Sequence, residues 1–370
     1  MSETNHADRL RRIEHELETL NLDFFLVIHL PNIRYLCGFT GSSGVLAFAN
    51  GIWSFFTDGR YTQQAKQEIS GATIRVNSLP ALAHAAQWTA GRMVRKRGRV
   101  RLGVEAEHLT LAMQAALAEQ LARALPKSRF RLISTNMTIE RLRMRKDAEE
   151  IQRIRDAVNL ASSIFPQMLE SVRTGTTEND VAGSLDHLAR SAGAEKMAFE
   201  SIVASAPRSA LPHARPTRAT IGRGFVVLDY GVILGGYCSD MTRTVHVGDA
   251  NKTSRDLYAA VLEAQLAGIA AVRPGRPAGE VDEAARKVLR KHKLDRFFTH
   301  SLGHGLGLEI HEAPRLARAQ TQALEPGMVI TIEPGVYIPG RGGVRIEDTV
   351  LVTKTGHEVL TPTSKDLVIR

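Results

Sequence analysis

The sequence has few cysteines and no long apolar run, and both shortages limit the class of protein that it can encode. Only two cysteines, Cys37 and Cys238, occur in the 370 residues, which leaves no disulfide framework and no CxxC metal or redox motif. The strongest early apolar run, residues 24–30, is too short to span a bilayer. Residues 1–20 are polar and lack the apolar core of a secretory signal. We therefore expect a cytoplasmic protein with reduced cysteines and no membrane partner.

Signatures of nucleic-acid binding are also missing, although the net charge is +9. The densest basic stretch runs from Arg92 to Arg101, and it has no interleaved aromatic side chains on which bases could stack. No helix-turn-helix or RNA-binding motif surrounds this stretch. A solvated helix end and loop explains these charges better, so we expect no nucleic-acid partner.

The length and the pattern of the sequence predict two domains. Residues 1–140 are predicted to form a small α/β domain that begins with a polar helix and a buried strand at residues 24–30. Asn50-Gly51 is a strong signal for a two-residue hairpin between two further strands. A charged stretch near residue 140 marks the boundary, and residues 141–370 are predicted to form the second domain.

The second domain is predicted to begin with a helix, because Asp147 can cap its N-terminus and Glu150 completes a capping box three residues later. From Phe225 onward, apolar runs typical of strands dominate, and two helices interrupt them. An antiparallel sheet flanked by helices is the natural architecture for such a pattern. Together the two domains predict the α+β class.

Four acidic residues and one histidine in the second domain each lie in a distinctive frame. The frames are Leu228-Asp229-Tyr230-Gly231, Ser239-Asp240-Met241-Thr242-Arg243-Thr244, Gly303-His304-Gly305-Leu306-Gly307, Ile332-Glu333-Pro334-Gly335 and Val344-Arg345-Ile346-Glu347-Asp348. Carboxylates can bridge two metal ions, and an oxygen-rich ligand set suits a hard cation such as manganese. A metal pair can generate a nucleophile from water and stabilise the oxyanion that follows. One frame alone would more often be a turn or a surface charge, but five in this order indicate a metallohydrolase.

The two aspartates are predicted to share a hairpin. A strand at residues 225–228 runs into Asp229, and glycines permit a turn before the return strand that carries Asp240. Two like charges held side by side are unfavourable unless a cation lies between them. Arg243 is expected on the opposite face of the strand from Asp240, so a metal ion is the better counter-charge.

The remaining ligand candidates lie on strands and on a glycine-rich turn. Strand alternation points Glu333 and Glu347 inward. His300 and His304 are four residues apart, like the ligands of a helical HExxH zinc site, but the Glu is missing and three alternate glycines disfavour a helix. We therefore expect a turn that brings the backbone close and presents His304 to the metals.

These frames resemble those of the pita-bread metallopeptidases, specifically the branch of Xaa-Pro aminopeptidase (aminopeptidase P) and Xaa-Pro dipeptidase (prolidase). The creatinase-like N-terminal domain of this branch is similar at Pro31-Asn32-Ile33-Arg34-Tyr35-Leu36 and at Thr57-Asp58-Gly59-Arg60-Tyr61. The second of these segments is closer to aminopeptidase P. The resemblance implies an α+β fold in which a small N-terminal α/β domain serves oligomerisation and access to the active site. A C-terminal pita-bread catalytic domain, with a curved antiparallel sheet flanked by helices, would follow.

The resemblance also implies a dinuclear metal centre. Its ligands would be Asp229, Asp240, His304, Glu333 and Glu347. Asp240 and Glu347 would bridge the two divalent ions, Asp229 would hold one of them, and His304 with Glu333 would hold the other. Manganese (Mn2+) is the expected metal, with cobalt (Co2+) or zinc (Zn2+) as alternatives.

Further residues match catalytic and substrate-binding positions of the branch. His213 and His311 would contact the substrate carbonyl and the reaction intermediate, and Glu333 would also transfer a proton. His300 would lie near the proline ring, and Arg345 near its carboxyl side. Each of the three histidines could instead satisfy backbone groups alone.

The function expected from this resemblance is hydrolysis of the peptide bond between an N-terminal residue and proline. Xaa-Pro aminopeptidase is the first expectation, and Xaa-Pro dipeptidase is the alternative. A catalytically inactive pita-bread binding protein is a remoter alternative, because such proteins usually lose ligands and none is lost here. The expected partners are proline-containing peptides and a second copy of the chain in a homodimer. One departure is Ala206, where the family commonly has Gly in the loop that leads to His213.

Overall fold

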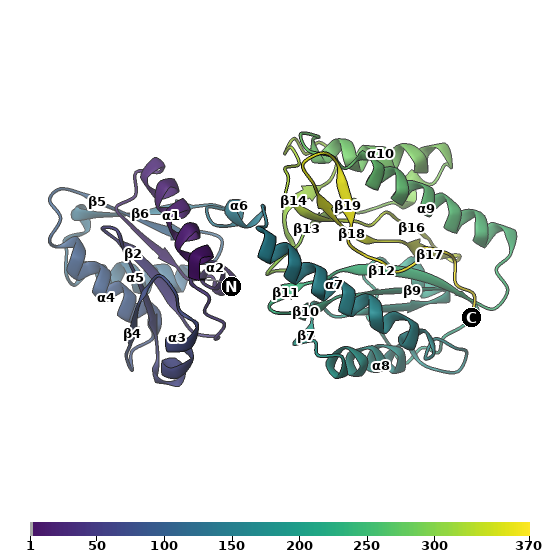
Figure 1. Ribbon diagram of the computed structural model, residues 1–370, viewed down its shortest axis with the longest axis horizontal. Helices are drawn as coiled ribbons and strands as arrows, with labels where there is room; N and C mark the ends of the chain where they lie inside the picture. Colours follow the sequence, from purple (N-terminus) through teal and green to yellow (C-terminus); the bar gives the residue numbers. More distant parts are fainter. Residues whose placement is uncertain (1–2) are drawn as a thin grey trace. The chain divides into compact units, whose positions relative to one another are not determined.

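The computed structural model describes residues 3–370 (Figure 1). Met1 and Ser2, which belong to the first predicted domain and to its polar start, lie outside the described residues. The chain divides into two compact units, Met1–Arg143 and Met144–Arg370. Among residues 3–370, no helix combines the length and the apolar character that crossing a membrane requires.

The first unit is built on a six-stranded sheet in the order β4-β3-β2-β1-β5-β6. Strand β2 pairs antiparallel with β1 and β3, and the other neighbours are parallel. The strands are β1 (Phe24–Val27), β2 (Val45–Ala49), β3 (Ile52–Thr57), β4 (Thr73–Val76), β5 (Val100–Glu105) and β6 (Phe130–Thr135). The helices are α1 (Glu3–Thr19), α2 (Leu30–Cys37), α3 (Thr62–Glu68), α4 (Ala81–Met93), α5 (Leu111–Ala122) and α6 (Glu140–Arg143), with short 3-10 helices η1 (Gly59–Tyr61) and η2 (Lys127–Arg129).

The hairpin between β2 and β3 confirms the local turn signal. Asn50 and Gly51 have φ angles of 51° and 74°, and a two-residue turn of this kind requires positive φ at both positions. The small side chains of Ala86 and Ala90 on α4 and the side chain of Leu117 on α5 lie in one core cluster with the strands. The first unit therefore buries a core of its own.

The strand predicted at residues 24–30 is shorter than expected. It ends at Val27, because the Glu105 carboxylate accepts hydrogen bonds from the backbone N–H groups of Ile28 (2.6 Å) and His29 (2.9 Å). These N–H groups lie just before α2, so a carboxylate at the end of the neighbouring strand β5, 77 positions away from Ile28 in the chain, stabilises the start of this helix. The sequence near residue 24 gives no sign of Glu105, so the end of the strand could not be predicted from it.

The second unit contains four long helices and thirteen strands, and all its strand pairs are antiparallel. The helices are α7 (Ala148–Leu169), α8 (Glu178–Ser191), α9 (Lys252–Ala271) and α10 (Ala278–Lys291), with 3-10 helices η3 (Ala206–Ala210) and η4 (Asp295–Phe297). The strands are β7 (Lys196–Met197), β8 (Ile202–Ser205), β9 (Gly224–Tyr230), β10 (Val232–Leu234), β11 (Tyr237–Cys238), β12 (Met241–Val247), β13 (Gly303–Gly305), β14 (Glu312–Leu316), β15 (Val329–Ile332), β16 (Gly335–Ile338), β17 (Gly342–Arg345), β18 (Asp348–Val352) and β19 (His357–Val359).

The strands of the second unit form a central layer between two helix pairs. The main sheets have the orders β12-β9-β8 and β14-β13-β15-β18-β19. One core cluster joins α7 and α8 to β9 and β12 through residues such as Phe165, Leu185 and Val226. A second joins α9 and α10 to β15 and β18 through residues such as Val281 and Ile330. In Figure 1, α9 and α10 lie above the strands, α8 lies at the lower edge of the unit and α7 runs diagonally beside β10 and β11. This combination of helices and antiparallel sheets confirms the α+β class.

Candidate active site

The second unit contains a cavity of about 490 Å³ into which the predicted site residues converge. The nine residues predicted from the sequence all line it: His213, Asp229, Asp240, His300, His304, His311, Glu333, Arg345 and Glu347. Six further residues complete the wall: Phe199, Ile202, Ser301, Ile310, Glu312 and Arg315. Residues separated by more than a hundred positions in the chain therefore share one space.

Strand ends place the acidic residues around one point. Asp229 lies on β9, Asp240 directly precedes β12, Glu333 directly follows β15 and Glu347 separates β17 from β18. Asp229 is paired in register with Thr242, so Asp240 lies beyond the last paired residues of the hairpin and not directly opposite Asp229. Because the backbone at Asp240 is not paired with the neighbouring strand, strand alternation does not fix the direction of its side chain, and the side chain points into the cavity.

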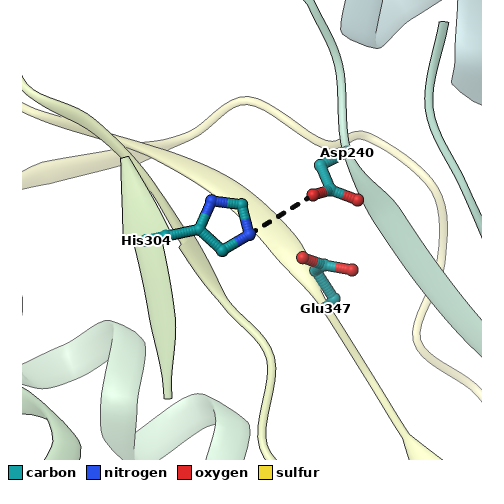
Figure 2. A group of neighbouring side chains, drawn as sticks. All are labelled: Asp240, His304 and Glu347. Carbon is teal, nitrogen blue, oxygen red and sulfur yellow. Dashed lines mark ion pairs between the residues drawn. The ribbon is translucent and has the colours of Figure 1, made fainter. Parts of the chain in front are cut away.

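His304 faces the carboxylates from β13. Figure 2 shows Asp240, His304 and Glu347 pointing toward one another from three different parts of the fold. Each of these three residues offers one ligand atom, and these atoms all lie within 4.8 Å of one another. His304 Nε2 lies 3.6 Å from Asp240 Oδ2 and 3.5 Å from Glu333 Oε1.

The proton of His304 is on the side away from the carboxylates. Nδ1 lies 2.9 Å from the Gly305 carbonyl oxygen, and a carbonyl can only accept, so Nδ1 donates and Nε2 presents its lone pair. Burial lowers the pKa of His304 to about 4. A neutral imidazole whose free nitrogen faces three carboxylates has the form that a metal ligand requires.

The four buried carboxylates share one cationic side chain, Arg345, which is bonded to Asp229. Burial, and after it the charges of neighbouring carboxylates, raises the pKa of Asp240 and of Glu347 well above the ordinary range. Burial also raises the pKa of Glu333 to about 8, with Arg345 acting in the opposite direction. The Oδ1 atoms of Asp229 and Asp240 are buried without a hydrogen-bond partner among the described residues. Orphaned carboxylate oxygens beside a neutral imidazole fit divalent cations.

Arg345 is occupied by protein groups. Its Nη2 donates to Asp229 Oδ2 at 2.6 Å, and its Nη1 donates to the Tyr337 hydroxyl at 2.5 Å and to the Pro212 carbonyl at 3.0 Å. Its Nε donates to Thr242 Oγ1 at 3.2 Å. A guanidinium with these partners orients Asp229 and has little capacity left for a substrate carboxylate.

His300 belongs to the same hydrogen-bond chain. Its Nδ1 donates to the Ser301 carbonyl oxygen at 2.8 Å, so its Nε2 accepts from the Tyr337 hydroxyl at 2.9 Å. Burial lowers the pKa of His300 to about 3, and the positive charge of Arg345 acts in the same direction. The sequence interpretation missed Tyr337, and its only local signal is Gly335, where a Cβ would lie 2.2 Å from the Tyr337 hydroxyl oxygen.

His213, His311 and Arg315 form the more open side of the cavity. The side chains of all three are exposed, and the ring of His311 lies edge-on to that of His304 at 4.4 Å between centroids. Arg315 is paired in register with His304 across β13 and β14, so both side chains lie on one face of the sheet. Arg315 makes no ion pair with any residue between positions 3 and 370, and the sequence interpretation did not single it out.

A cluster of buried carboxylates around a neutral histidine, in a cavity between strands, is a ligand set of the kind that metal-dependent hydrolases use. The family models identify the family: Metallopeptidase family M24 matches residues 152–354, and the Creatinase/Prolidase N-terminal domain matches residues 9–145. The chain belongs to metallopeptidase family M24.

Individual proteins of known name are similar over nearly the whole chain. The Xaa-Pro dipeptidase of Pyrococcus horikoshii is 34% identical over 98% of this chain and 99% of its own length. The structure of an Xaa-Pro dipeptidase from Bacillus anthracis has a TM-score of 0.92 at 36% identity, covering 99% of this chain and 100% of that one. The X-Pro aminopeptidase of Thermotoga maritima has a TM-score of 0.86 at 31% identity, covering 96% and 100%. These matches confirm the resemblance and the creatinase-like plus pita-bread architecture.

Proposed function

We propose that this protein is a metallopeptidase that hydrolyses the bond between an N-terminal residue and proline, and that it acts as an Xaa-Pro dipeptidase. The comparisons favour the dipeptidase alternative over the aminopeptidase that the N-terminal segments suggested. The B. anthracis dipeptidase matches at a higher TM-score and a higher identity than the T. maritima aminopeptidase. A further relative at 46% identity over 62% of this chain is also named Xaa-Pro dipeptidase.

The position of Arg315 is the structural observation that favours a dipeptide as the substrate. In an Xaa-Pro dipeptide, the free carboxylate of proline lies next to the bond that is cleaved, so a cation is required close to the metal ligands. Arg315 is paired with His304 across two strands and has no ion-pair partner among the described residues, whereas Arg345 is bound to Asp229 and Tyr337. A guanidinium can bind a carboxylate through two parallel hydrogen bonds.

The metal centre is proposed to hold two divalent ions, with manganese as the first candidate. Asp229, Asp240, His304, Glu333 and Glu347 would be the ligands, and the ions, when bound, would supply Lewis-acid chemistry that activates water and offsets negative charge. The orphaned oxygens of Asp229 and Asp240 support this set. Electrostatic stabilisation aimed at the developing oxyanion is commonly the largest single contribution to catalysis.

The other polar residues would guide the substrate and its protons. His213 and His311 reach the cavity from exposed positions, and we propose that their ring N–H groups donate to the carbonyl oxygen as it gains charge. As water adds to the carbonyl carbon and the C–N bond breaks, the proline nitrogen needs a proton. Glu333 is proposed to accept the proton from water and deliver it to this nitrogen. The apolar side chains of Phe199 and Ile202 would contact the N-terminal residue.

The test is hydrolysis of an Xaa-Pro dipeptide beside the matching Xaa-Pro-Xaa tripeptide, with manganese and with chelator. We expect metal-dependent cleavage of the dipeptide and little cleavage of the tripeptide. Equal or faster cleavage of the tripeptide would make the protein an aminopeptidase. Cleavage of neither would refute the proposal.

The Arg315→Ala variant sharpens this test. Because charge-assisted hydrogen bonds would be lost, we expect KM for the dipeptide to rise about 10- to 100-fold. The tripeptide carries its carboxylate farther from the metals, so its KM should not rise in parallel. Arg318→Ala is the matched control, since Arg318 is exposed and lines a different cavity. An unchanged KM in Arg315→Ala would remove the structural reason for preferring a dipeptide and leave only the similarity to named dipeptidases.

We also propose that the protein is a cytoplasmic homodimer. The N-terminal unit matches the creatinase/prolidase domain model, to which the sequence resemblance attached a role in oligomerisation. Light scattering of the purified protein checks the oligomeric state, and a monomeric mass would refute it.

A further inference from the structure

The loop that carries His213 requires an anchor. We define the His213 loop as residues 206–216, between β8 and the segment that leads to β9. His213 is exposed and lines the cavity, and no hydrogen bond of its ring to another described residue fixes its position. The position of this ring therefore depends on what holds the loop.

Glu178 holds both ends of the His213 loop. It is the first residue of α8, and its side chain is 0% exposed. Its Oε1 accepts the backbone N–H of Ser205 at 3.0 Å. Its Oε2 accepts the backbone N–H of Thr217 at 3.1 Å and the Thr217 hydroxyl at 2.8 Å. Ser205 directly precedes the loop and Thr217 directly follows it, so one carboxylate joins the two ends.

Glu178 also holds the loop from inside through Arg208. Arg208 Nε lies 3.0 Å from both carboxylate oxygens of Glu178, and Arg208 Nη2 donates to the Arg215 carbonyl oxygen at 2.8 Å. The guanidinium therefore ties the first half of the loop to the second, two residues from His213. A buried carboxylate with this many donors is held firmly, because each bond restricts the others.

The helix itself does not need this carboxylate. Thr177 caps α8 by accepting the Asp180 backbone N–H at 3.1 Å, and Asp180 in turn accepts the Thr177 backbone N–H at 2.8 Å. The capping box is complete without Glu178. An acidic residue in the first helical turn is favourable in general, but this one is turned toward the loop.

The loop begins in an unfavourable backbone conformation. Ala206 has a φ of 53°, a left-handed conformation that is unfavourable for residues with a Cβ. The Ser209 hydroxyl donates to the Ala206 carbonyl oxygen at 2.6 Å and accepts the Gly343 N–H at 2.9 Å. A strained conformation persists only where the surroundings impose it. Ser209 bonds Ala206 itself, and Glu178 bonds Ser205, the residue before it.

The far side of the loop touches the site. The Pro212 carbonyl oxygen accepts from Arg345 Nη1, and the same guanidinium donates to Asp229. The loop therefore ends beside Arg345, which keeps Tyr337 and Thr242 as further partners when it orients Asp229.

We propose that Glu178 is a positioning residue that fixes His213 in the cavity without touching the substrate. The proposal rests on the proposed peptidase function, in which His213 donates to the substrate carbonyl. Glu178→Gln keeps the size of the side chain but replaces one accepting oxygen with a donating NH2 group. Either Ser205 or Thr217 then loses its acceptor, and Arg208 loses one of its two in both cases.

Steady-state kinetics of the full-length manganese enzyme with an Xaa-Pro dipeptide are the first measurement. We expect Glu178→Gln to lower kcat about 10- to 100-fold while KM changes little, because small misplacements of catalytic groups cost rate. Glu280→Gln is the matched control, since Glu280 lies in the first turn of α10 and pairs with Arg276 on the surface. Its kcat should equal that of the wild type.

A double-mutant comparison separates positioning from general destabilisation. If Glu178 acts through His213, adding Glu178→Gln to His213→Ala should cause no further loss of kcat. The same fold-loss in both backgrounds would show a merely structural role and would overturn the proposal.

Hydrogen exchange provides a readout that does not depend on peptidase activity. We expect the Ser205 or the Thr217 amide, whichever loses its acceptor, to exchange at least about tenfold faster in Glu178→Gln, with the α10 amides unchanged. If the wild type cleaves no Xaa-Pro peptide, the proposed function fails while exchange still decides whether Glu178 holds the loop. Unchanged exchange at both amides would overturn the proposal. Should Glu178→Gln not fold, Arg208→Met removes the internal tie alone; kcat should again fall while the Ser205 and Thr217 amides, which keep Glu178 as acceptor, exchange as in the wild type, and an unchanged kcat would overturn the proposal.

Discussion

The individual carboxylates of the site are costly when no cation is near them. Burial and mutual repulsion raise the pKa of Asp240 and Glu347 well above the ordinary range, so each negative charge is unfavourable in the metal-free protein. With a divalent cation bound, the same negative charges become favourable, because they attract the cation. The carboxylates that lower the stability of the metal-free protein are therefore the ones that would bind the metal ions.

The Asp240→Asn variant tests this reversal. Removing one charge relieves repulsion in the apoprotein, so we expect its unfolding midpoint to rise by about 2–4 °C, which corresponds to roughly 1 kcal/mol in a domain of this size. Manganese should no longer raise the midpoint, and dipeptide hydrolysis should be lost. Thermal unfolding with and without metal provides the measurement. A lower apoprotein midpoint together with normal stabilisation by manganese would contradict the prediction.

Ala206 has a φ of 53°, a conformation that suits the Gly which the sequence resemblance leads us to expect at this position. Alanine in the left-handed conformation costs about 1–2 kcal/mol of stability. Replacing it with Gly removes this cost, but the greater conformational freedom of Gly in the unfolded chain offsets part of the stabilisation. We expect Ala206→Gly to stabilise the protein by up to about 1 kcal/mol and to retain activity. Urea unfolding measures the change.

Ala210 serves as the control for Ala206, because it ends the same 3-10 helix and is not among the residues with positive φ. Ala210→Gly should therefore destabilise the protein by about 0.5–1 kcal/mol. Equal destabilisation by both substitutions would show that the conformation of Ala206 is not strained.

At the scale of secondary-structure elements, buried ion pairs connect strands that carry the ligands. Arg243 on β12 donates to Asp348 Oδ1 at 2.8 Å and to the Glu347 carbonyl oxygen at 2.6 Å. Asp348 Oδ2 also accepts from Gln265 and Lys365, at 2.8 Å and 2.7 Å. The network joins β12, β18, α9 and the C-terminal segment, so it fixes the backbone next to Glu347.

Replacing Arg243 with Met should break this network. The charge of Asp348 would stay buried with fewer partners, and the loss of one member of a buried pair costs about 3–5 kcal/mol. Arg273→Met is the control, because Arg273 is exposed in the loop after α9 and exposed charges contribute little. Urea unfolding of both variants checks the difference. A similar, small effect in both would mean that the network adds nothing to stability.

Elements whose determinants are local were predictable from the sequence. The Asn50-Gly51 hairpin and the capping box of Asp147 with Glu150 occur where the pattern places them, because neighbouring residues supply every group involved. The end of β1 was not predictable, since Glu105 acts on it from a strand that lies far away in the chain. The end of a strand or helix cannot be predicted from the local sequence when a side chain from a distant part of the chain determines it.

At the scale of the whole molecule, the two units should respond differently to metal. All five candidate ligands belong to Met144–Arg370, while Met1–Arg143 has a core of its own. We expect calorimetry to show that manganese raises only the transition of the second unit. At a free concentration of 100 times Kd, one site stabilises by about 2.7 kcal/mol. A parallel shift of both transitions, or of neither, would contradict this expectation.

The sequence by itself indicated the side chains of the candidate metal centre and its histidines. Each ligand candidate lies in a short frame in which a strand end or a glycine-rich turn sets its direction, and the nine predicted residues all line one space. The tertiary structure decided which charges are already paired there. Arg345 reaches Asp229 across 116 positions, while Arg315, paired with His304 across the sheet, keeps its cation free of ion pairs among the described residues. The physical reason is that the residues next to a side chain in the sequence set its direction, whereas the pairing of distant strands determines which groups surround it. For a charged side chain, these surrounding groups decide whether it is paired within the protein or is available to bind the substrate.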